Sequence, residues 1–308
     1  MSEAISESLH SGDSLVIDGF THLICFAAGH EIIRQGINNL TAIRLTPDLV
    51  YDQLIEAECV RKLVFSWAGN PGVGSLHGFR RRTQKDSKKD SQKDSQNEST
   101  PRLELEEYSH FGMVARFLAG SSGLPFWPLN NYAGSNLADV NSLIRSIECP
   151  YTGQTLATVP AIHPDVAVLH CQRADRQGNA QVWGLMGTQK EAAFASKRVI
   201  VVAEEIVETS LIRKDPNRTL IPSIIVDHVV HEPWGAHPSY VQGYYDRDND
   251  FYVKWEDISK NTETYRDYLN DFVFGVKSRD AYLKKMGSTY WDKLVAKSRM
   301  CEGVDYGF

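Results

Sequence analysis

Short apolar runs alternate with amphipathic stretches along the first two thirds of this 308-residue chain. Residues 14–19 (SLVIDG), 41–45 (TAIRL) and 62–67 (KLVFSW) are aliphatic, β-branched runs bounded by turn formers, which is typical of buried strands. Residues 27–37 and 51–59 between them have helical spacing, and residues 165–171 and 197–207 are two further strands. This succession predicts an α/β fold with a mostly parallel sheet flanked by helices.

The last sixty residues have a different character, because residues 250–261, 262–276 and 278–288 are amphipathic helices rich in aromatic side chains. We therefore expect an α/β domain over residues 1–248 and a C-terminal helical extension over residues 249–308. The apolar faces of these helices are expected to pack on the same domain, or against a partner subunit. Their apolar positions are Phe251, Trp255, Ile258, Tyr265, Leu269 and Phe272.

Residues 85–100 consist of four polar tetrads (KDSK, KDSQ, KDSQ, NEST) without an apolar side chain. A segment of this composition cannot bury enough surface to offset the entropy of ordering it. We expect a disordered surface insertion over residues 83–101, with a docking or phosphorylation tail as the functional alternative.

Composition narrows the possible functions. The net charge of -6 argues against nucleic acid as the main partner, and no apolar run is long enough to span a bilayer. The N-terminus is too polar for a signal peptide, so a cytoplasmic location is expected. The five cysteines form no CxxC pair, which speaks against a zinc cage or a disulfide framework.

Ligands of parallel sheets bind in the loops beyond the carboxyl ends of the strands. The loop after residue 18 has a glycine that permits close backbone approach before a helix start, although an ordinary turn has the same pattern. Residues 66–75 (SWAGNPGVGS) contain three glycines and a proline, which favours a ligand cradle. The candidate substrate-binding residues in these two loops are Gly19, Phe20, Thr21, His22, Ser66, Gly69, Asn70, Gly72 and Ser75.

Residues 103–107 (LELEE) alternate leucine and glutamate, which predicts a strand with both leucines on a buried face. Ser109 suits the N-cap of the following helix. His110 then lies at a strand-to-helix junction, either as a ligand contact or as a histidine bonded within the protein. Glu106 and Glu107 look like an acid/base pair, but their position at a strand end favours a solvated or salt-bridged framework.

Two later loops carry further polar residues. Arg173 follows a strand and precedes a Gly-Asn turn, so it is a candidate clamp for a carboxylate or phosphate. Residues 231–237 (HEPWGAH) have the wrong spacing for a zinc-binding HExxH helix, and their proline opposes a helix, so no metal site is expected. The sequence has no GxSxG elbow or Walker loop.

Five stretches taken together resemble the A (alpha) subunit of a family I coenzyme A-transferase, of the type found in glutaconate CoA-transferase. They occur in the family's order at residues 12–22, 66–81, 106–126, 170–184 and 233–248. The resemblance implies a parallel α/β sheet of the CoA-transferase type. It also implies a hetero-oligomer with a separately encoded B subunit.

The activity implied by the resemblance is the transfer of CoA between an acyl-CoA and a carboxylic acid. In this family a glutamate carboxylate attacks the thioester, forms a mixed anhydride and then a glutamyl–CoA thioester, and so splits one difficult step into easier ones. That glutamate lies in the B subunit, so no catalytic nucleophile is expected in this chain. Coenzyme A enters as a thioester substrate, and no permanently bound cofactor is expected.

The chain departs from the family pattern at two positions. Asp18 stands where many members of the family have a glycine, in the loop after the first strand. His110 stands where related hydrolases that open a steroid ring carry a glutamate, and where fused relatives carry a glutamine that faces substrate. A neutral donor or acceptor at this position fits transferase chemistry better than a second carboxylate.

Two alternatives stay open from the sequence. The first is a hydrolase or retro-Claisen enzyme that opens a ring in a CoA thioester, with Glu106, Glu107 or His110 as the base. The second is a ligand-sensing module of the same fold without catalytic activity.

Overall fold

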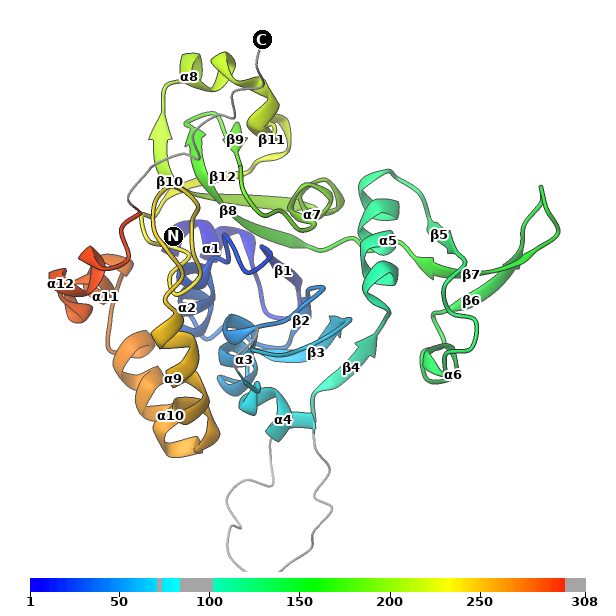
Figure 1. Cartoon of the computed structure of the whole chain (residues 1–308), viewed down its shortest axis with the longest axis horizontal. Coiled ribbons are helices and arrows are strands. Elements are labelled where there is room, and N and C mark those ends of the chain that lie inside the picture. Colours follow the sequence, from blue (N-terminus) through cyan, green and yellow to red (C-terminus); the bar gives the residue numbers. More distant parts are fainter. Residues whose placement is uncertain (71–73, 84–101, 297–308) are drawn as a thin grey trace, which may run out of the picture.

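A nine-stranded sheet forms the centre of the computed structural model, which describes residues 1–70, 74–83 and 102–296 (Figure 1). The predicted mostly parallel α/β fold is confirmed, because the strands in the order β12-β10-β8-β1-β2-β3-β4 all pair in parallel. The candidate Gly72 and the expected insertion, apart from Thr83, lie outside the described residues. The parallel strands are β1 (Ser14–Asp18), β2 (Leu40–Ile43), β3 (Val60–Phe65), β4 (Glu104–Glu107), β8 (Val166–Asp175), β10 (Arg198–Val207) and β12 (His228–His231).

The strand β8 is twice as long as β1 and serves two parts of the sheet. Its first half pairs with β1, and its second half continues beyond the end of β1 to pair antiparallel with β9 (Ala180–Gln181). The short β11 (Thr219–Ile221) pairs antiparallel with β9 and ends the sheet. This extension places Arg173 beyond the carboxyl end of β1.

Helices cover both faces of the sheet, as the alternation within β1 requires. Leu15 and Ile17 face one core together with α1, α2, α3, α9 and α10, whereas Val16 faces a second core with α5 and α7. Each layer removes a continuous apolar surface from water, which is the main term that stabilises such a fold. These helices are α1 (Ser2–Ser8), α2 (Phe26–Arg34), α3 (Leu49–Glu56), α5 (His110–Ser121), α7 (Gln189–Ala195), α9 (Asn249–Lys260) and α10 (Thr262–Leu269).

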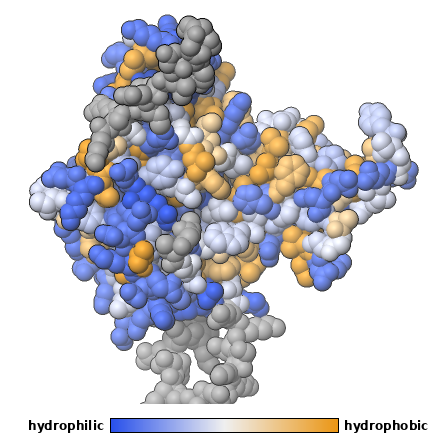
Figure 2. Space-filling model, in the orientation of Figure 1, coloured by the Kyte–Doolittle hydropathy of each residue, from blue (hydrophilic) through white to orange (hydrophobic). Residues whose placement is uncertain are grey.

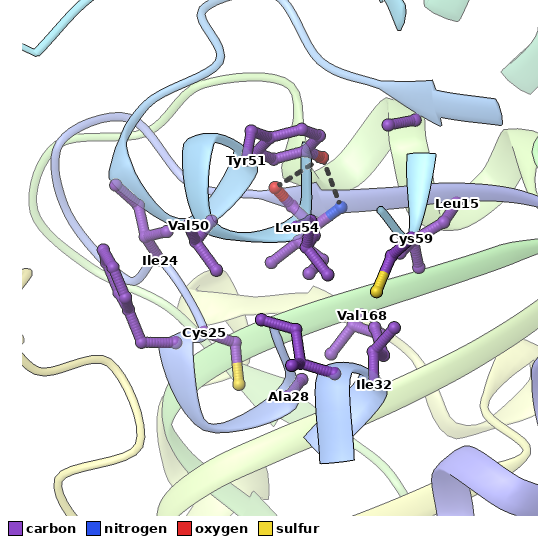
Figure 3. Packing of buried hydrophobic residues seen from close by; sticks show 14 of the residues in the cluster. Leu15, Ile24, Cys25, Ala28, Ile32, Val50, Tyr51, Leu54, Cys59 and Val168 are labelled. Carbon is purple, nitrogen blue, oxygen red and sulfur yellow. Dashed lines mark hydrogen bonds between the residues drawn. The ribbon is translucent and has the colours of Figure 1, made fainter. Parts of the chain in front are cut away.

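Helix α3 shows how the first core fixes the strand ends. Its Asp48 N-cap accepts a hydrogen bond from the Val50 amide, and Val50, Tyr51 and Leu54 pack against α2 and the sheet (Figure 3). The buried Tyr51 hydroxyl accepts from the Ile17 amide at 2.9 Å and donates to the Ile43 carbonyl at 2.8 Å. One side chain therefore links the carboxyl ends of β1 and β2.

The C-terminal helices pack on the α/β body, as their aromatic spacing predicts. Trp255 is fully buried, and Phe251, Tyr265 and Leu269 join the same core as α2 and α3. The predicted helix over residues 262–276 is divided, because α10 is followed by a π-helical turn at Asn270–Phe274. The last helices are α11 (Arg279–Met286) and α12 (Ser288–Asp292).

A separate three-stranded antiparallel sheet, which we call the arm, projects from the body beyond α5 (Figure 1). The sequence pattern did not predict it. The arm consists of β5 (Phe126–Leu129), β7 (Thr155–Pro160) and β6 (Arg145–Glu148), in that spatial order. The remaining helical elements are α4 (His77–Thr83), α6 (Leu137–Val140), α8 (Thr209–Lys214) and two 3-10 turns, Pro216–Arg218 and Ser223–Ile225.

The expected burial of β4 is wrong for one of its leucines. Leu103, just before the strand, is buried, but Leu105 is 44% exposed. The physical reason is that β4 is the edge strand, paired only with β3. Leu105 instead lines a cavity of about 540 Å³ along the open edge, together with residues 140–143.

None of the helices in the described ranges is long and apolar enough to cross a membrane. The four cysteines within those ranges, Cys25, Cys59, Cys149 and Cys171, are free thiols. The same part of the chain contains no cluster of three or more acidic, histidine or cysteine side chains that would suit a metal ion.

Candidate functional site

The loop after β1 is held in a single conformation by a glycine and by bonds to distant segments. A Cβ on Gly19 would lie 2.5 Å from the His22 carbonyl oxygen, so only glycine fits there. Thr21 has a positive φ of 55°, which costs a threonine conformational energy, and its carbonyl accepts from the Ser239 hydroxyl at 2.9 Å. The loop is therefore a rigid feature of the strand end.

His22 lies inside the protein, with both ring nitrogens bonded to backbone. Its Nε2 accepts from the Gln242 amide at 3.0 Å, so Nδ1 carries the proton that is donated to the Leu185 carbonyl at 2.9 Å. Burial lowers the pKa of His22 to about 4, so the ring is neutral at pH 7. The His22 side chain positions the loop, and Phe20 and Thr21 before it are partly exposed.

Asp18 ties this loop to the start of α7. Its carboxylate accepts from the Thr188 hydroxyl at 3.0 Å, and Gly187 lies against Phe20. Burial raises the pKa of Asp18, and the positive charge of Arg44 opposes that rise. Asp18, which departs from the family pattern, therefore links the end of β1 to the segment before α7 by a hydrogen bond.

Arg44 is a fully buried cation beneath the same loop. Its guanidinium donates to the carbonyl oxygens of Ile17 at 2.8 Å and Gly19 at 2.6 Å, and it pairs with Asp48 at 3.3 Å. Both members of this ion pair are 1% exposed. Charge and hydrogen bonding thus fix the last residue of β1 relative to the start of α3.

Ser66 and His110 meet where the neighbouring strands β3 and β4 end. The Ser66 hydroxyl donates to the Leu45 carbonyl at 2.6 Å, so it accepts from Nδ1 of His110 at 3.0 Å. The His110 side chain is exposed, and no described residue bonds to its Nε2. The pair leaves one oriented imidazole nitrogen available to a ligand at the carboxyl edge of the sheet.

Ser109 is the N-cap of α5, as predicted, and its hydroxyl is fully engaged. It accepts from the Gly112 amide and from the Asn131 side chain, both at 3.0 Å, and it donates to the Tyr132 hydroxyl at 3.1 Å. Asn131 and Tyr132 follow β5 of the arm and carry no local motif. The sequence could not identify them, because only the fold brings residues 131–132 to the start of α5.

The glycine-rich loop after β3 docks the C-terminal extension. Buried Asn70 donates from its side chain to the Tyr252 carbonyl at 2.9 Å, and the Ser75 amide donates to Glu256 at 3.1 Å. Gly69 lies under the Trp67 ring, which is 51% exposed. The Asn70 side chain and the Ser75 amide therefore bond to α9, and Trp67 is an exposed side chain in the described part of the loop.

Arg173 is held in the β8–β9 hairpin. Its Nε donates to the Gln181 side chain at 2.6 Å, and its guanidinium lies 5.5 Å from the centre of the Trp183 ring. The structure thus brings Ser66, Ser109 and His110 together and leaves Arg173 in a separate part of the edge.

Glu106 is a paired framework residue, as the strand position predicted. Burial favours a raised pKa for this carboxyl group, but bonds and charge from Lys62 and Arg116 outweigh it and lower the pKa. Arg116 donates to Glu106 at 2.7 Å, and the Tyr108 hydroxyl donates to it at 2.8 Å. A carboxylate stabilised in its charged form is a poor proton acceptor.

Comparison with known proteins agrees with this arrangement of strands and loops. The sequence pattern of the coenzyme A transferase family matches residues 1–232. The chain is 46% identical over 284 residues to the A subunit of 3-oxoadipate CoA-transferase from Pseudomonas knackmussii, covering 92% of this chain and 96% of that protein. It is 33% identical over 306 residues to the A subunit of glutaconate CoA-transferase from Acidaminococcus fermentans, covering 94% and 91%.

The crystal structure of glutaconate coenzyme A-transferase from Acidaminococcus fermentans superposes with a TM-score of 0.86 at 32% identity, covering 96% of this chain and 94% of that chain. The chain therefore belongs to the coenzyme A transferase family, as the five stretches of sequence predicted. The same comparisons confirm the prediction that the chain is part of a CoA-transferase enzyme.

Proposed function

We propose that this chain is the A subunit of a heteromeric CoA-transferase that moves CoA between an acyl-CoA and a carboxylic acid. The observation that carries the proposal is the likeness, over almost the whole length, to two chains that are both named as the A subunit of a CoA-transferase. The partner B subunit supplies the glutamate that forms the glutamyl–CoA intermediate. This chain supplies the edge formed by the β1 loop, Ser66 and His110, and needs no resident cofactor.

The substrate class follows from the same relatives. The named acids, 3-oxoadipate and glutaconate, are both dicarboxylates, so the proposed acceptor is a small dicarboxylic acid, with 3-oxoadipate the first to test. The complex with its B subunit should convert 3-oxoadipate and an acyl-CoA donor into 3-oxoadipyl-CoA and the free acid of the donor. Hydrolysis of the acyl-CoA to free CoA, without transfer of CoA to any acid, would contradict the proposed transferase activity and favour the alternative hydrolase activity.

His110 is the proposed substrate-side contact in this chain. Replacing it with alanine should lower kcat/KM about tenfold to a hundredfold, which corresponds to one hydrogen bond to a charged or developing-charge oxygen. His110→Gln keeps a donor and an acceptor and should retain more activity than His110→Ala. His163→Ala is the matched control, because His163 is exposed and precedes β8 at the opposite edge of the sheet.

An unchanged kcat/KM in His110→Ala would remove His110 from the site. A loss that glutamine does not partly restore would point to proton transfer by the imidazole instead of hydrogen bonding. Both results are read from steady-state rates of CoA transfer by the complex.

Glu106 and Glu107 are proposed to be framework. Changing both to glutamine should leave kcat/KM within about threefold and lower the free energy of unfolding by about 1–3 kcal/mol, because Arg116 loses its charged partner. Thermal unfolding and transfer rates of the same preparation separate the two effects. A loss of several orders of magnitude in rate, in protein that is still folded, would favour the hydrolase with a glutamate base.

A further inference from the structure

The arm exposes an apolar face that nothing in the described part of this chain covers. Residues paired directly across antiparallel strands place their side chains on the same face. In the arm Phe126 pairs with Pro160, Pro128 with Thr158 and Arg145, and Ile147 with Leu156. This set defines the outer face of the arm: Phe126, Pro128, Arg145, Ile147, Leu156, Thr158 and Pro160.

The opposite face of the arm already has a partner within the chain. Leu129 and Val159 on that face are buried in the core that contains α5. The outer face is more open, since Phe126 is 38% and Ile147 is 40% exposed. Every residue of β6 is exposed, and Figure 2 shows hydrophobic side chains at the surface over α5 and along the arm.

An antiparallel sheet that stands alone normally has one apolar face and one polar face. The arm has apolar residues on both faces, and an exposed apolar surface on a folded protein marks an interaction site. The outer face of the arm therefore fits a protein partner with an apolar surface and a carboxylate that can meet Arg145.

The position of the arm beside the candidate site indicates which partner would bind its outer face. Asn131 and Tyr132 lie just after the carboxyl end of β5, and both hydrogen-bond to Ser109, the neighbour of His110. The arm is therefore joined to the body at the edge of the candidate site. Among the described residues, no carboxylate bonds to Ser66 or His110. The chain that supplies the nucleophile has to approach this same edge, and the arm stands next to it.

We propose that the outer face of the arm is a docking surface for the B subunit. This inference rests on the proposed function, which supplies the identity of the partner. A second copy of this chain is the competing occupant. The surface combines apolar residues in the outer two rows with Arg145 and Thr158 in the row between them, so it offers apolar contacts and one cation.

Two substitutions on neighbouring residues of β6 test the proposal. Ile147→Glu places a charge on the outer face, whereas Ser146→Glu places the same charge on the opposite face of the same exposed strand. Binding of the purified chain to its B subunit is measured by sedimentation velocity without substrate. Ile147→Glu should weaken the association at least tenfold, and Ser146→Glu should leave it within about twofold of the unchanged chain.

Arg145→Glu is the second variant on the outer face and alters no buried side chain, so it decides the case if Ile147→Glu does not fold. It too should weaken association with the B subunit. Unchanged binding of B by the folded outer-face variants would overturn the proposal. So would a loss of self-association by the isolated chain with B binding intact, which would assign the face to a second copy.

Failure of this inference is distinguishable from failure of the proposed function. The first is read from binding by variants, and the second from CoA transfer by the unaltered complex. If the unaltered complex transfers CoA and Ile147→Glu still binds B normally, the arm proposal alone is wrong.

Discussion

Replacing Arg44 with methionine is expected to lower the free energy of unfolding by about 3–5 kcal/mol, because it leaves buried Asp48 without its cation. The carbonyl oxygens of Ile17 and Gly19 also lose their donor. Methionine keeps most of the volume of the side chain, so the loss reports on charge and hydrogen bonding. Urea unfolding of the two proteins measures the difference.

The control for Arg44 is Arg61, whose ion pair with Glu104 is largely exposed, at 45% and 56%. Arg61→Met should change stability by at most about 1 kcal/mol. Adding Asp48→Asn to Arg44→Met removes the unpaired charge and should restore part of the stability. Equal effects of Arg44→Met and Arg61→Met would contradict the structural role of the buried pair.

The stability deficit of Arg44→Met should also depend on pH. Burial already raises the pKa of Asp48 and of Asp18, and the charge of Arg44 opposes that rise. Without Arg44 their folded-state pKa values rise further above the unfolded values. Protonation then favours the folded form, so the deficit should be smaller at pH 5 than at pH 8.

The second large effect is expected for Gly19→Ala. The new methyl group would lie 2.5 Å from the His22 carbonyl oxygen and 2.8 Å from the Leu23 carbonyl oxygen, and neither backbone atom can yield without moving the loop. A shift of this size at a site edge can lower kcat/KM about a hundredfold, because positioning contributes much of the rate. Steady-state CoA transfer by the complex measures the loss.

Gly36→Ala is the matched control for Gly19→Ala. Gly36 has a positive φ of 66° and no neighbour within 4 Å of an added Cβ, so alanine there costs backbone strain alone. It should lower stability by about 1 kcal/mol and leave the transfer rate unchanged. An active Gly19→Ala enzyme would show that the β1 loop is not part of the site.

The central sheet was predictable because its strands are continuous apolar runs that only a buried parallel sheet accommodates. The arm was missed because its strands lack that pattern. Pro128 lies within β5 and Pro160 ends β7, and β6 has a single isoleucine among polar residues. The burial of Leu105 was predicted wrongly because alternation reports a strand but not whether anything covers it.

The sequence predicted several residues of the candidate site but not which of them contact one another. Ser66 lies at the end of one predicted strand and His110 follows another. Their contact, between residues 44 positions apart in sequence, depends on β3 and β4 being neighbours. His22 had the same sequence signal as His110, and only the fold shows that its ring is buried between Leu185 and Gln242. Burial of a loop side chain depends on distant segments that no local pattern reveals.

The central claim is that this chain contributes half of an active site whose nucleophile belongs to the B subunit. The most direct test is the intact mass of both proteins of the complex after incubation with an acyl-CoA and an acid quench. The account predicts a covalent CoA adduct on the B subunit, with none on this chain. An adduct on this chain, at Glu106, Glu107 or any other residue, would contradict it.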